Sequence, residues 1–441
     1  MKNLIATIKN IWRIEELRKR ILLTLGLLLV YRIGSFIVLP GVDSVRLGSA
    51  SAGGTGLVDL LSVFTGGAFT RASIFALGVM PYISASIIMQ LAGIAIPAVQ
   101  KMQREESGRR RMNQWTRYIT ILICLFQAPG YILTYVPPEA RGTGSLWLPT
   151  SVIILTCSTL FVMWLGERIT ERGLGNGTSL IIMVGILARL PEAFLQEFIS
   201  RTSGGGGLVV VLVEVVMWLL IIAGNILLVQ GTRRIPVQFA KRVQGNKQYG
   251  GVRNYIPLKV NAAGVMPIIF AQAIVLIPVY LTQTPWFKDV QWMQHFSRYE
   301  SVAYNVVLFL MVVAFTYFYT AITVNPNQLA DDMKRNGGFV PGVKPGKQTA
   351  SYIDDLLSRI TLPGAVFLGL VAILPAFAIA AGVKQGFAQF FGGTSLLIMV
   401  GVLLDTLQQI ESHLLMRHYD GLMKSGRIKG RQSAAYSMAT G

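Results

Sequence analysis

Residues 56–92 join a half-length apolar segment to a full-length one through a glycine pair, Gly66 and Gly67. A bilayer core requires ~20 apolar residues of helix to cross it, so residues 57–64 are too short and are expected to enter and turn back. Non-helical backbone at the glycine pair is tolerated at that depth only where protein covers it or water reaches it. The pattern therefore predicts a chain that surrounds an aqueous path, with residues 57–64 in its mouth.

The composition is typical of a membrane protein, because 52% of the residues are hydrophobic, 14% are charged and the mean hydropathy is +0.53. We predict an all-α fold with ten transmembrane helices, each bounded by charge, Pro or Gly. The predicted spans begin near Ile21, Ala72, Tyr118, Leu148, Thr178, Leu208, Leu258, Val302, Ile360 and Thr394.

Basic residues are concentrated in alternate connections between these spans. Segments 1–20, 97–117, 166–175, 230–259, 325–359 and 411–441 hold 31 of the 40 Lys and Arg residues, which predicts that both termini are cytoplasmic. Topology thus explains most of the net charge of +19, and no zinc or RNA-binding signature points to nucleic acid. Residues 231–259 hold no acid, so they could also bind an acidic protein or ribosomal RNA. The alternative is that these basic residues only orient the neighbouring spans in the membrane.

The predicted spans divide into two sets of five at the glycine-rich connection 203–207. Because five is odd, duplicated halves would lie in opposite orientations, with a pore or site at their interface. The fifth and tenth spans share GTSL followed by MVG, which we interpret as a likeness of two Gly-started helices rather than as ancestry. The predicted units are an amphipathic cytoplasmic helix at 1–20, a first half at 21–202, a second half at 203–410 with cytoplasmic loops 230–259 and 325–359, and a cytoplasmic tail at 411–441.

The fifth span is expected to be short, at ~13 to 16 residues, because Arg189 and Pro191 follow it. Charge within the predicted spans is scarce, with Arg32, Glu214 and Asp405 as the candidates. An ion-coupled transporter usually carries ionisable groups near the midplane, whereas an apolar constriction gates an aqueous pore by dewetting. The helices expected to face the path offer apolar residues, for which core packing is the alternative. They are Val79, Ile83, Ile182, Ile269 and Ile398.

No enzyme chemistry is evident in the sequence. It has no Walker loop, nucleophile elbow or pair of catalytic carboxylates. His295, His413 and His418 are too scattered to suggest a metal site. We therefore expect no catalytic residues, no cofactor and no metal.

A set of motifs runs from about residue 14 to about residue 430. They are LRKRILLTLGLLLVYRIGSFIVLPGVD, FTGGAFTRASIFALGVMPYISASIIMQL, EESGRRRMNQWTRY, WLGERITERGLGNGTSLII, PLKVNAAGVMPIIFA, FVPGVKPGKQTA and FGGTSLLIMV. In this order and spacing they resemble the bacterial SecY family of protein-translocation channels. The resemblance implies an hourglass pore between two five-helix halves in the bacterial inner membrane.

The resemblance also implies a function, the passage of unfolded secretory polypeptides across the membrane and the sideways release of transmembrane segments into lipid. Signal-sequence-bearing polypeptides, a SecA-like motor ATPase, the ribosome and SecE-like and SecG-like small subunits are the implied partners. A plug is implied at 56–64, with Leu57, Val58, Leu60, Leu61, Val63 and Phe64. The implied pore ring consists of Val79, Ile83, Thr178, Ile182, Ile269 and Ile398.

A lateral gate is implied between the second and third spans and the seventh and eighth. Its Pro and small residues would weaken the gate helices and limit their packing; the implied gate residues are Pro81, Ser84, Gln90, Asn261, Pro267 and Ile277. The two long cytoplasmic loops would dock the motor and the ribosome through Arg233, Arg234, Lys241, Arg242, Lys344 and Lys347.

Two positions depart from the family's usual residues. Thr178 stands where the family has an aliphatic residue, so the closed ring could be wetter unless the hydroxyl bonds its own helix backbone. Lys344 stands where Arg is usual and lacks its planar fork of donors, a deficit that Lys347 could share. Two rival functions remain, a secondary transporter with a broken helix at its site and a membrane scaffold that gathers partners.

Overall fold

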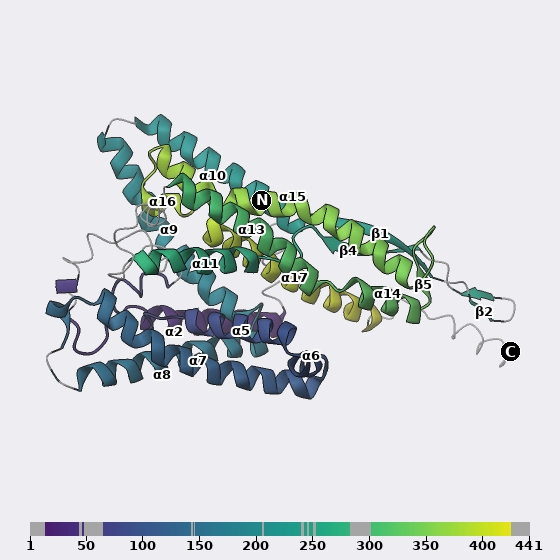
Figure 1. Ribbon diagram of the computed structural model, residues 1–441, viewed down its shortest axis with the longest axis horizontal. Coiled ribbons are helices and arrows are strands. Elements are labelled where there is room, and N and C mark those ends of the chain that lie inside the picture. Colours follow the sequence, from purple (N-terminus) through teal and green to yellow (C-terminus); the bar gives the residue numbers. More distant parts are fainter. Residues whose placement is uncertain are drawn as a thin grey trace.

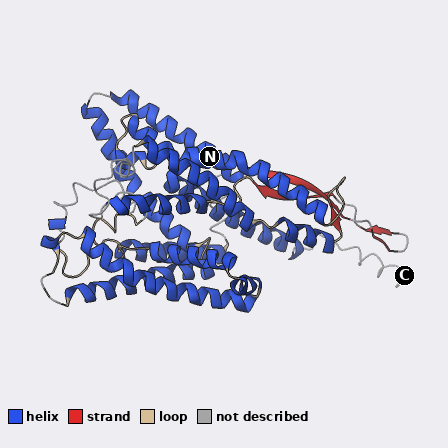
Figure 2. Ribbon diagram, viewed as in Figure 1, coloured by secondary structure: helices blue, strands red, loops and turns tan. Residues whose placement is uncertain are grey.

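The computed structural model describes residues 14–43, 46–47, 65–142, 144, 146–204, 207–239, 242–244, 247–249, 253–282 and 301–424. The predicted plug and most of the predicted amphipathic helix at 1–20 lie outside these ranges. The described chain is mostly helical, with a small sheet at one end (Figure 2).

A helix lies at each of the ten places where a span is predicted. These helices are α2 (Glu15–Gly34), α5 (Met80–Ala95), α7 (Glu106–Tyr135), α8 (Trp147–Arg172), α9 (Gly177–Gly204), α10 (Gly207–Gln230), α11 (Met266–Thr282), α13 (Val302–Thr323), α15 (Lys347–Ala380) and α17 (Gly393–Lys424). Shorter helices are α6 (Pro97–Arg104), η2 (Pro138–Ala140), α14 (Pro326–Arg335) and α16 (Gln385–Ala388). Within the described ranges, seven stretches are long and apolar enough to cross a membrane, so the chain is a multi-pass membrane protein. Helices α5 and α11 contain only 16 and 17 residues, and α2 opens on a charged turn.

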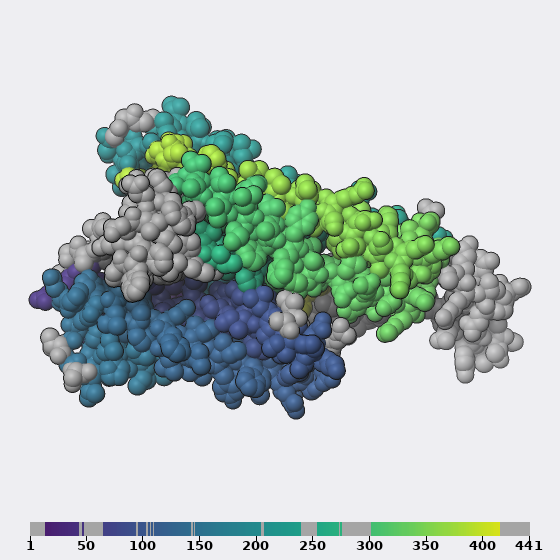
Figure 3. All heavy atoms as spheres, in the orientation of Figure 1, coloured from purple at the N-terminus to yellow at the C-terminus, as the bar shows by residue number. Residues whose placement is uncertain are grey.

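The helices form two groups that follow the order of the chain. In Figure 1, α2 and α5 to α8 lie below, and α10, α11, α13 and α15 lie above. Within the first group α7 packs against both α5 and α8, and within the second α13 packs against both α11 and α15. Helices α9 and α17 pack against each other and connect the groups. The space-filling view shows the blue and green halves meeting along a seam (Figure 3).

The predicted start of the second span at Ala72 is wrong, because residues 65–79 form successive turns and α5 begins only at Met80. Four residues of this segment have left-handed backbone, with φ values of +64°, +85°, +45° and +53° at Gly66, Gly67, Ala72 and Gly78. An α-helix cannot contain such residues. Apolar character alone therefore placed the start of the helix too early.

Two further span boundaries differ from the prediction. The seventh does not begin at Leu258, since β4 continues to Lys259 and α11 starts at Met266. The fifth does not end before Pro191, because α9 continues through this proline to Gly204. Packing of the outer turns explains the longer helix: Ala193 lies in a core cluster with Phe387 of α16, and neighbouring helices commonly make a proline tolerable within a membrane helix.

Two short sequences each occur twice, five spans apart. GVMP precedes or begins both α5 and α11, and its glycines, Gly78 and Gly264, have φ values of +53° and +65°. GTSL begins both α9 and α17, at Gly177 and Gly393. Because both pairs of matches lie five spans apart, they favour duplicated halves over the chance likeness that GTSL alone suggested.

The loops at 230–259 and 325–359 combine into one folded unit, which lies at the right of Figure 1. Strand β1 (Thr232–Phe239) pairs antiparallel with β4 (Arg253–Lys259) on one side and with β5 (Gly338–Phe339) on the other. Strands β2 (Arg242–Gln244) and β3 (Lys247–Tyr249) form a separate hairpin. A core beneath the larger sheet includes Ile235, Val237, Leu258, Ile353 and Leu357. The helical fold thus carries a small sheet that the sequence analysis did not predict.

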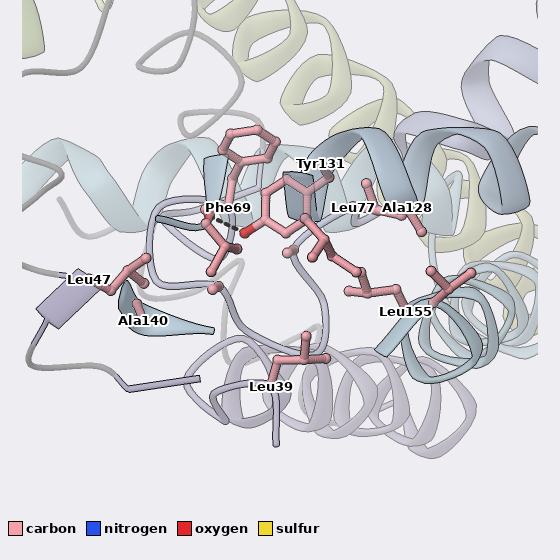
Figure 4. Packing of buried hydrophobic residues seen from close by; sticks show 13 residues of the cluster. Leu39, Leu47, Phe69, Leu77, Ala128, Tyr131, Ala140 and Leu155 are labelled. Carbon is pink, nitrogen blue, oxygen red and sulfur yellow. Dashed lines mark hydrogen bonds between the residues drawn. The ribbon is translucent and has the colours of Figure 1, made fainter. Parts of the chain in front are cut away.

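The irregular segment 65–79 is anchored to the first half by a buried tyrosine (Figure 4). The Tyr131 hydroxyl of α7 donates a hydrogen bond to the Phe69 carbonyl at 2.6 Å, and the two rings lie 4.7 Å apart, edge to face. Leu39, Leu77 and Leu155 belong to the same buried cluster. The Phe69 carbonyl, which lies outside any helix, thus accepts a short hydrogen bond from Tyr131 and a longer one, of 3.3 Å, from the Ala72 amide.

We expect Tyr131→Phe to lower the free energy of unfolding by about 0.5–1.5 kcal/mol, because it removes the shorter of the two hydrogen bonds to the Phe69 carbonyl and leaves only the one from the Ala72 amide at 3.3 Å. Thermal unfolding in detergent measures the change. Tyr118→Phe is the matched control, since Tyr118 is 66% exposed on the same helix. Equal transition temperatures for the two variants would contradict the assigned anchor.

Candidate functional site

A cavity of about 640 Å³ lies between the two halves of the molecule. Its wall includes residues of α5, α7, α8, α9, α11 and α17. Part of the wall is apolar and part is polar. The polar part includes Gln90, Asn113, Arg117, Glu167, Asn176 and Asp405.

The structure brings five of the six predicted ring residues to this cavity. They are Ile83 of α5, Thr178 and Ile182 of α9, Ile269 of α11 and Ile398 of α17. Val79 does not line it; this residue is 6% exposed and packs in a cluster with Phe75 and Val162. The apolar part of the wall therefore draws on four helices and on both halves.

The GNG sequence before α9 fixes the start of that helix. A side chain at Gly177 would collide with the Gly166 carbonyl of α8, so only glycine allows this approach. The Gly177 amide donates to the Thr170 hydroxyl at 2.9 Å, and the Ser179 amide donates to the Asn176 side chain at 3.3 Å. These contacts set the helix so that Thr178 and Ile182, one turn apart, both reach the cavity.

Thr178 lies in the first turn of α9, where no helical carbonyl precedes it. Within the described ranges its hydroxyl makes no hydrogen bond. The bond to its own helix backbone that the sequence allowed is therefore not observed. A free hydroxyl in an otherwise apolar part of a cavity wall can bind water.

The polar wall carries an ion pair between two helices. Arg117 of α7 binds Glu167 of α8 through two hydrogen bonds of 2.7 and 3.1 Å. Asp405 of α17 also lines the cavity and is exposed in it. All three charges face the cavity, and Asp405, the one that falls within a predicted span, lies where an intramembrane charge is expected.

Two of the predicted gate residues are prolines, and neither interrupts a helix. Pro81 and Pro267 occupy the first turns of α5 and α11, where a proline removes no helical hydrogen bond. The expectation that they weaken these helices is wrong for that reason. Ser84 donates to the Met80 carbonyl within α5. Asn261 lies in the turn before α11 with a buried, unpaired Oδ1. Ile277 lies in α11.

Gln90, the remaining gate residue, bridges the two halves. Its Oε1 accepts a hydrogen bond from the Tyr319 hydroxyl of α13 at 3.0 Å, and its Nε2 donates to Ser86 at 3.4 Å. The sequence analysis missed Tyr319. A tyrosine on an apolar span was the available signal, since a half-buried hydroxyl needs a partner.

The predicted docking residues lie at the sheet end of the molecule. Arg233 and Arg234 are exposed on β1, and Lys344 and Lys347 are exposed before and at the start of α15. Arg242 lies on β2, whereas Lys241 falls outside the described residues. The plug residues 57–64 also fall outside them. In the described part of the chain, no group of His, Cys, Asp or Glu could hold a metal ion.

The sequence matches known proteins along most of its length. A model of the SecY family matches residues 73–407. Protein translocase subunit SecY of Mycobacterium tuberculosis (strain H37Rv) is 42% identical over 441 residues, which cover 93% of this chain and 98% of that protein. Protein translocase subunit SecY of Haemophilus influenzae is 41% identical over 428 residues, which cover 94% and 96%.

The fold also matches solved structures. A protein-conducting channel superposes with a TM-score of 0.60 at 16% identity, covering 90% of this chain and 92% of that one. A structure of SecY, whose plug domain is said to stabilize the closed state and maintain a membrane seal, gives 0.59 at 16% identity and the same coverage. Sec61 in a canine ribosome-channel complex gives 0.57 at 15% identity, again over 90% and 92%. These likenesses show a shared fold.

We expect Gln90 and Tyr319 to be energetically coupled by about 0.5–1.5 kcal/mol, the usual net contribution of one hydrogen bond. A double-mutant cycle of Gln90→Leu and Tyr319→Phe, followed by thermal unfolding, measures the coupling. Pairing Gln90→Leu with Tyr317→Phe is the control, because Tyr317 points its hydroxyl toward Ser358 of α15. Strictly additive effects for the first pair would show that the bridge contributes nothing.

Proposed function

This chain belongs to the SecY family, and on that premise we propose that it forms the pore of a protein-conducting channel. Unfolded secretory polypeptides pass through the cavity between the halves, and transmembrane segments leave it sideways into lipid. One observation carries the proposal: four isoleucines and Thr178, from four helices and both halves, meet at this cavity. An interface of two repeats is where such a path is expected.

The apolar wall suits a waist that must close around many different side chains. Branched aliphatic groups offer no specific hydrogen bonds, so they do not select among passing residues, and a ring of them excludes ions by dewetting. The charged side chains Arg117, Glu167 and Asp405 keep the rest of the cavity wet. A polypeptide therefore enters through water and meets a single apolar step.

Residues 57–64 act as the plug on the outer side of this waist. The position of the segment that follows supports the assignment, because Gly66 packs against Gly185 of α9, three residues beyond Ile182. A plug that continues from this point needs only a short displacement to cover or clear the apolar step.

The lateral gate lies between α5 and α7 on one side and α11 and α13 on the other. The Gln90–Tyr319 hydrogen bond supports this assignment, since it joins the two sides beside the cavity. One such bond is weak enough to break when an apolar segment enters. The mechanism is passive, with the channel gating a chain that another machine drives.

The sheet end of the molecule binds the partner that drives the polypeptide through the channel, a SecA-like motor ATPase or a ribosome. Pairing of β1 with β5 unites the two basic loops into one platform, which supports a single docking surface. Sec61, which shares the fold, is found in a ribosome-channel complex. SecE-like and SecG-like subunits accompany the chain in a bacterial inner membrane, with both termini cytoplasmic as the basic connections indicate.

A photocrosslinking residue at Ile83 tests the path directly. We expect a stalled secretory polypeptide to attach there in cells, because Ile83 lines the cavity at its apolar part. The same probe at Ile153, which is 60% exposed on α8 away from the cavity, is the control and should attach lipid or nothing. Attachment at Ile153 with none at Ile83 would place the path elsewhere and refute the proposal.

Replacing Thr178 by isoleucine tests the waist as a seal. We expect Thr178→Ile to reduce resting ion leak through the closed channel, since it removes the one hydroxyl among the five ring residues at the cavity. Ion current across planar bilayers measures the leak, and Thr116→Val is the control, because Thr116 lines the cavity outside the ring and its hydroxyl donates to the backbone of its own helix. Unchanged leak in Thr178→Ile would mean that the hydroxyl does not wet the waist.

A further inference from the structure

Residues 65–79, here called the plug root, join the proposed plug to α5. Three cross-contacts secure the far part of this segment: the Ile74 amide donates to Ile37, the Ala72 carbonyl accepts from Leu39, and the Phe69 carbonyl accepts from Tyr131. All three lie several residues from the plug. These contacts fix the position of the later part of the root, but they do not hold its first residues.

Gly66, close to the predicted plug, is bound by a charged side chain of a predicted span. Arg32, in the last turn of α2, donates through Nη1 to the Gly66 carbonyl at 3.0 Å. The same nitrogen lies 3.4 Å from the Ser35 hydroxyl. Gly66 is the second described residue after the predicted plug. Arg32 therefore binds the chain two residues after the last residue of the predicted plug.

The guanidinium of Arg32 is held in place by an aromatic ring. Its Cζ lies 4.7 Å from the ring centroid of Phe36, one turn further along the chain. Arg71 contacts the same ring at 4.6 Å but makes no hydrogen bond within the described residues. Two like charges thus share one ring, and only Arg32 reaches the root backbone.

The other side of Gly66 is closed by α9. A Cβ placed on Gly66 would lie 3.0 Å from both Arg32 Nη1 and the Gly185 Cα atom. Gly66 also has a φ of +64°, which strains any other residue. The root is therefore confined between a charged side chain and a helix backbone, just outward of the ring residue Ile182.

We propose that Arg32 is a positioning residue that holds the plug root against α9 and so limits the resting ion current through the channel. The inference rests on the proposed function of residues 57–64 as a plug. A charged donor makes a stronger hydrogen bond than a neutral one. Arginine suits the position better than lysine, because its planar guanidinium lies over the Phe36 ring while its Nη1 donates to Gly66 and Ser35.

The test is the resting ion current of Arg32→Lys, which keeps the charge but lacks the planar guanidinium that lies over Phe36 with its Nη1 at the Gly66 carbonyl. Losing one charge-assisted hydrogen bond shifts an equilibrium by roughly tenfold, so we expect the time-averaged current to rise by about that factor. Arg71→Lys is the matched control, with the same ring and the same substitution, and its current stays at the wild-type level. Ser35→Ala, a milder change beside the same guanidinium, gives a smaller rise if Arg32→Lys fails to fold.

A second measurement separates a role through the plug from a general loosening. In a chain that lacks residues 57–64, resting current is already high, and Arg32→Lys adds nothing to it. An equal rise in the intact and plug-deleted chains overturns the proposal, as does wild-type current in Arg32→Lys and in Ser35→Ala. Unchanged current on deleting 57–64 alone refutes the plug itself, an outcome that a failure of Arg32 alone does not produce.

Discussion

Every buried backbone group at membrane depth needs a partner, and residues 65–79 are where this chain meets that requirement without a helix. An unpaired group in hydrocarbon costs several kcal/mol. The segment answers with its own turns, a bridge between Val38 and Ser73, and donors from Tyr131 and Arg32. Helices α7 and α8 pack a buried cluster around it. The helices of the first half thus pack around one irregular segment, residues 65–79.

Close approach of α9 to α8 and to residues 65–79 shapes the cavity wall next to this segment. Gly177 lets α9 begin against α8, and Gly66 lets the root cross α9 at Gly185. A single helix therefore contacts the irregular segment and presents Thr178 and Ile182 to the cavity. Any shift of α9 moves both Thr178 and Ile182 and the surface on which residues 65–79 rest, so the proposed ring and the plug root are mechanically linked.

The sequence could predict what depends on hydropathy and local glycine patterns. Ten apolar stretches correspond to ten helices, and five of the six ring positions line one cavity. It could not predict what depends on partners distant in the chain. The Gln90–Tyr319 bridge spans 229 positions, and Gln238 of β1 pairs with Phe339 of β5, 101 positions later. The helix boundaries near Ala72 and Pro191 failed for the same reason, since hydropathy does not report left-handed turns or the packing that sustains a proline.

The three charges within the predicted spans show how the chain can be both charged and passive. Arg32 binds the plug root, Glu214 binds Arg201 at 2.7 Å beside the outer end of α9, and Asp405 faces the cavity. None of them is among the ring residues. A pump or ion-coupled transporter needs titrating groups at the step that it controls, whereas a ring of aliphatic side chains has no such group and stores no energy from protons or ions. A ring of this kind leaves the drive for a polypeptide to come from another source, and the basic platform at the sheet end is the docking surface that we propose for it.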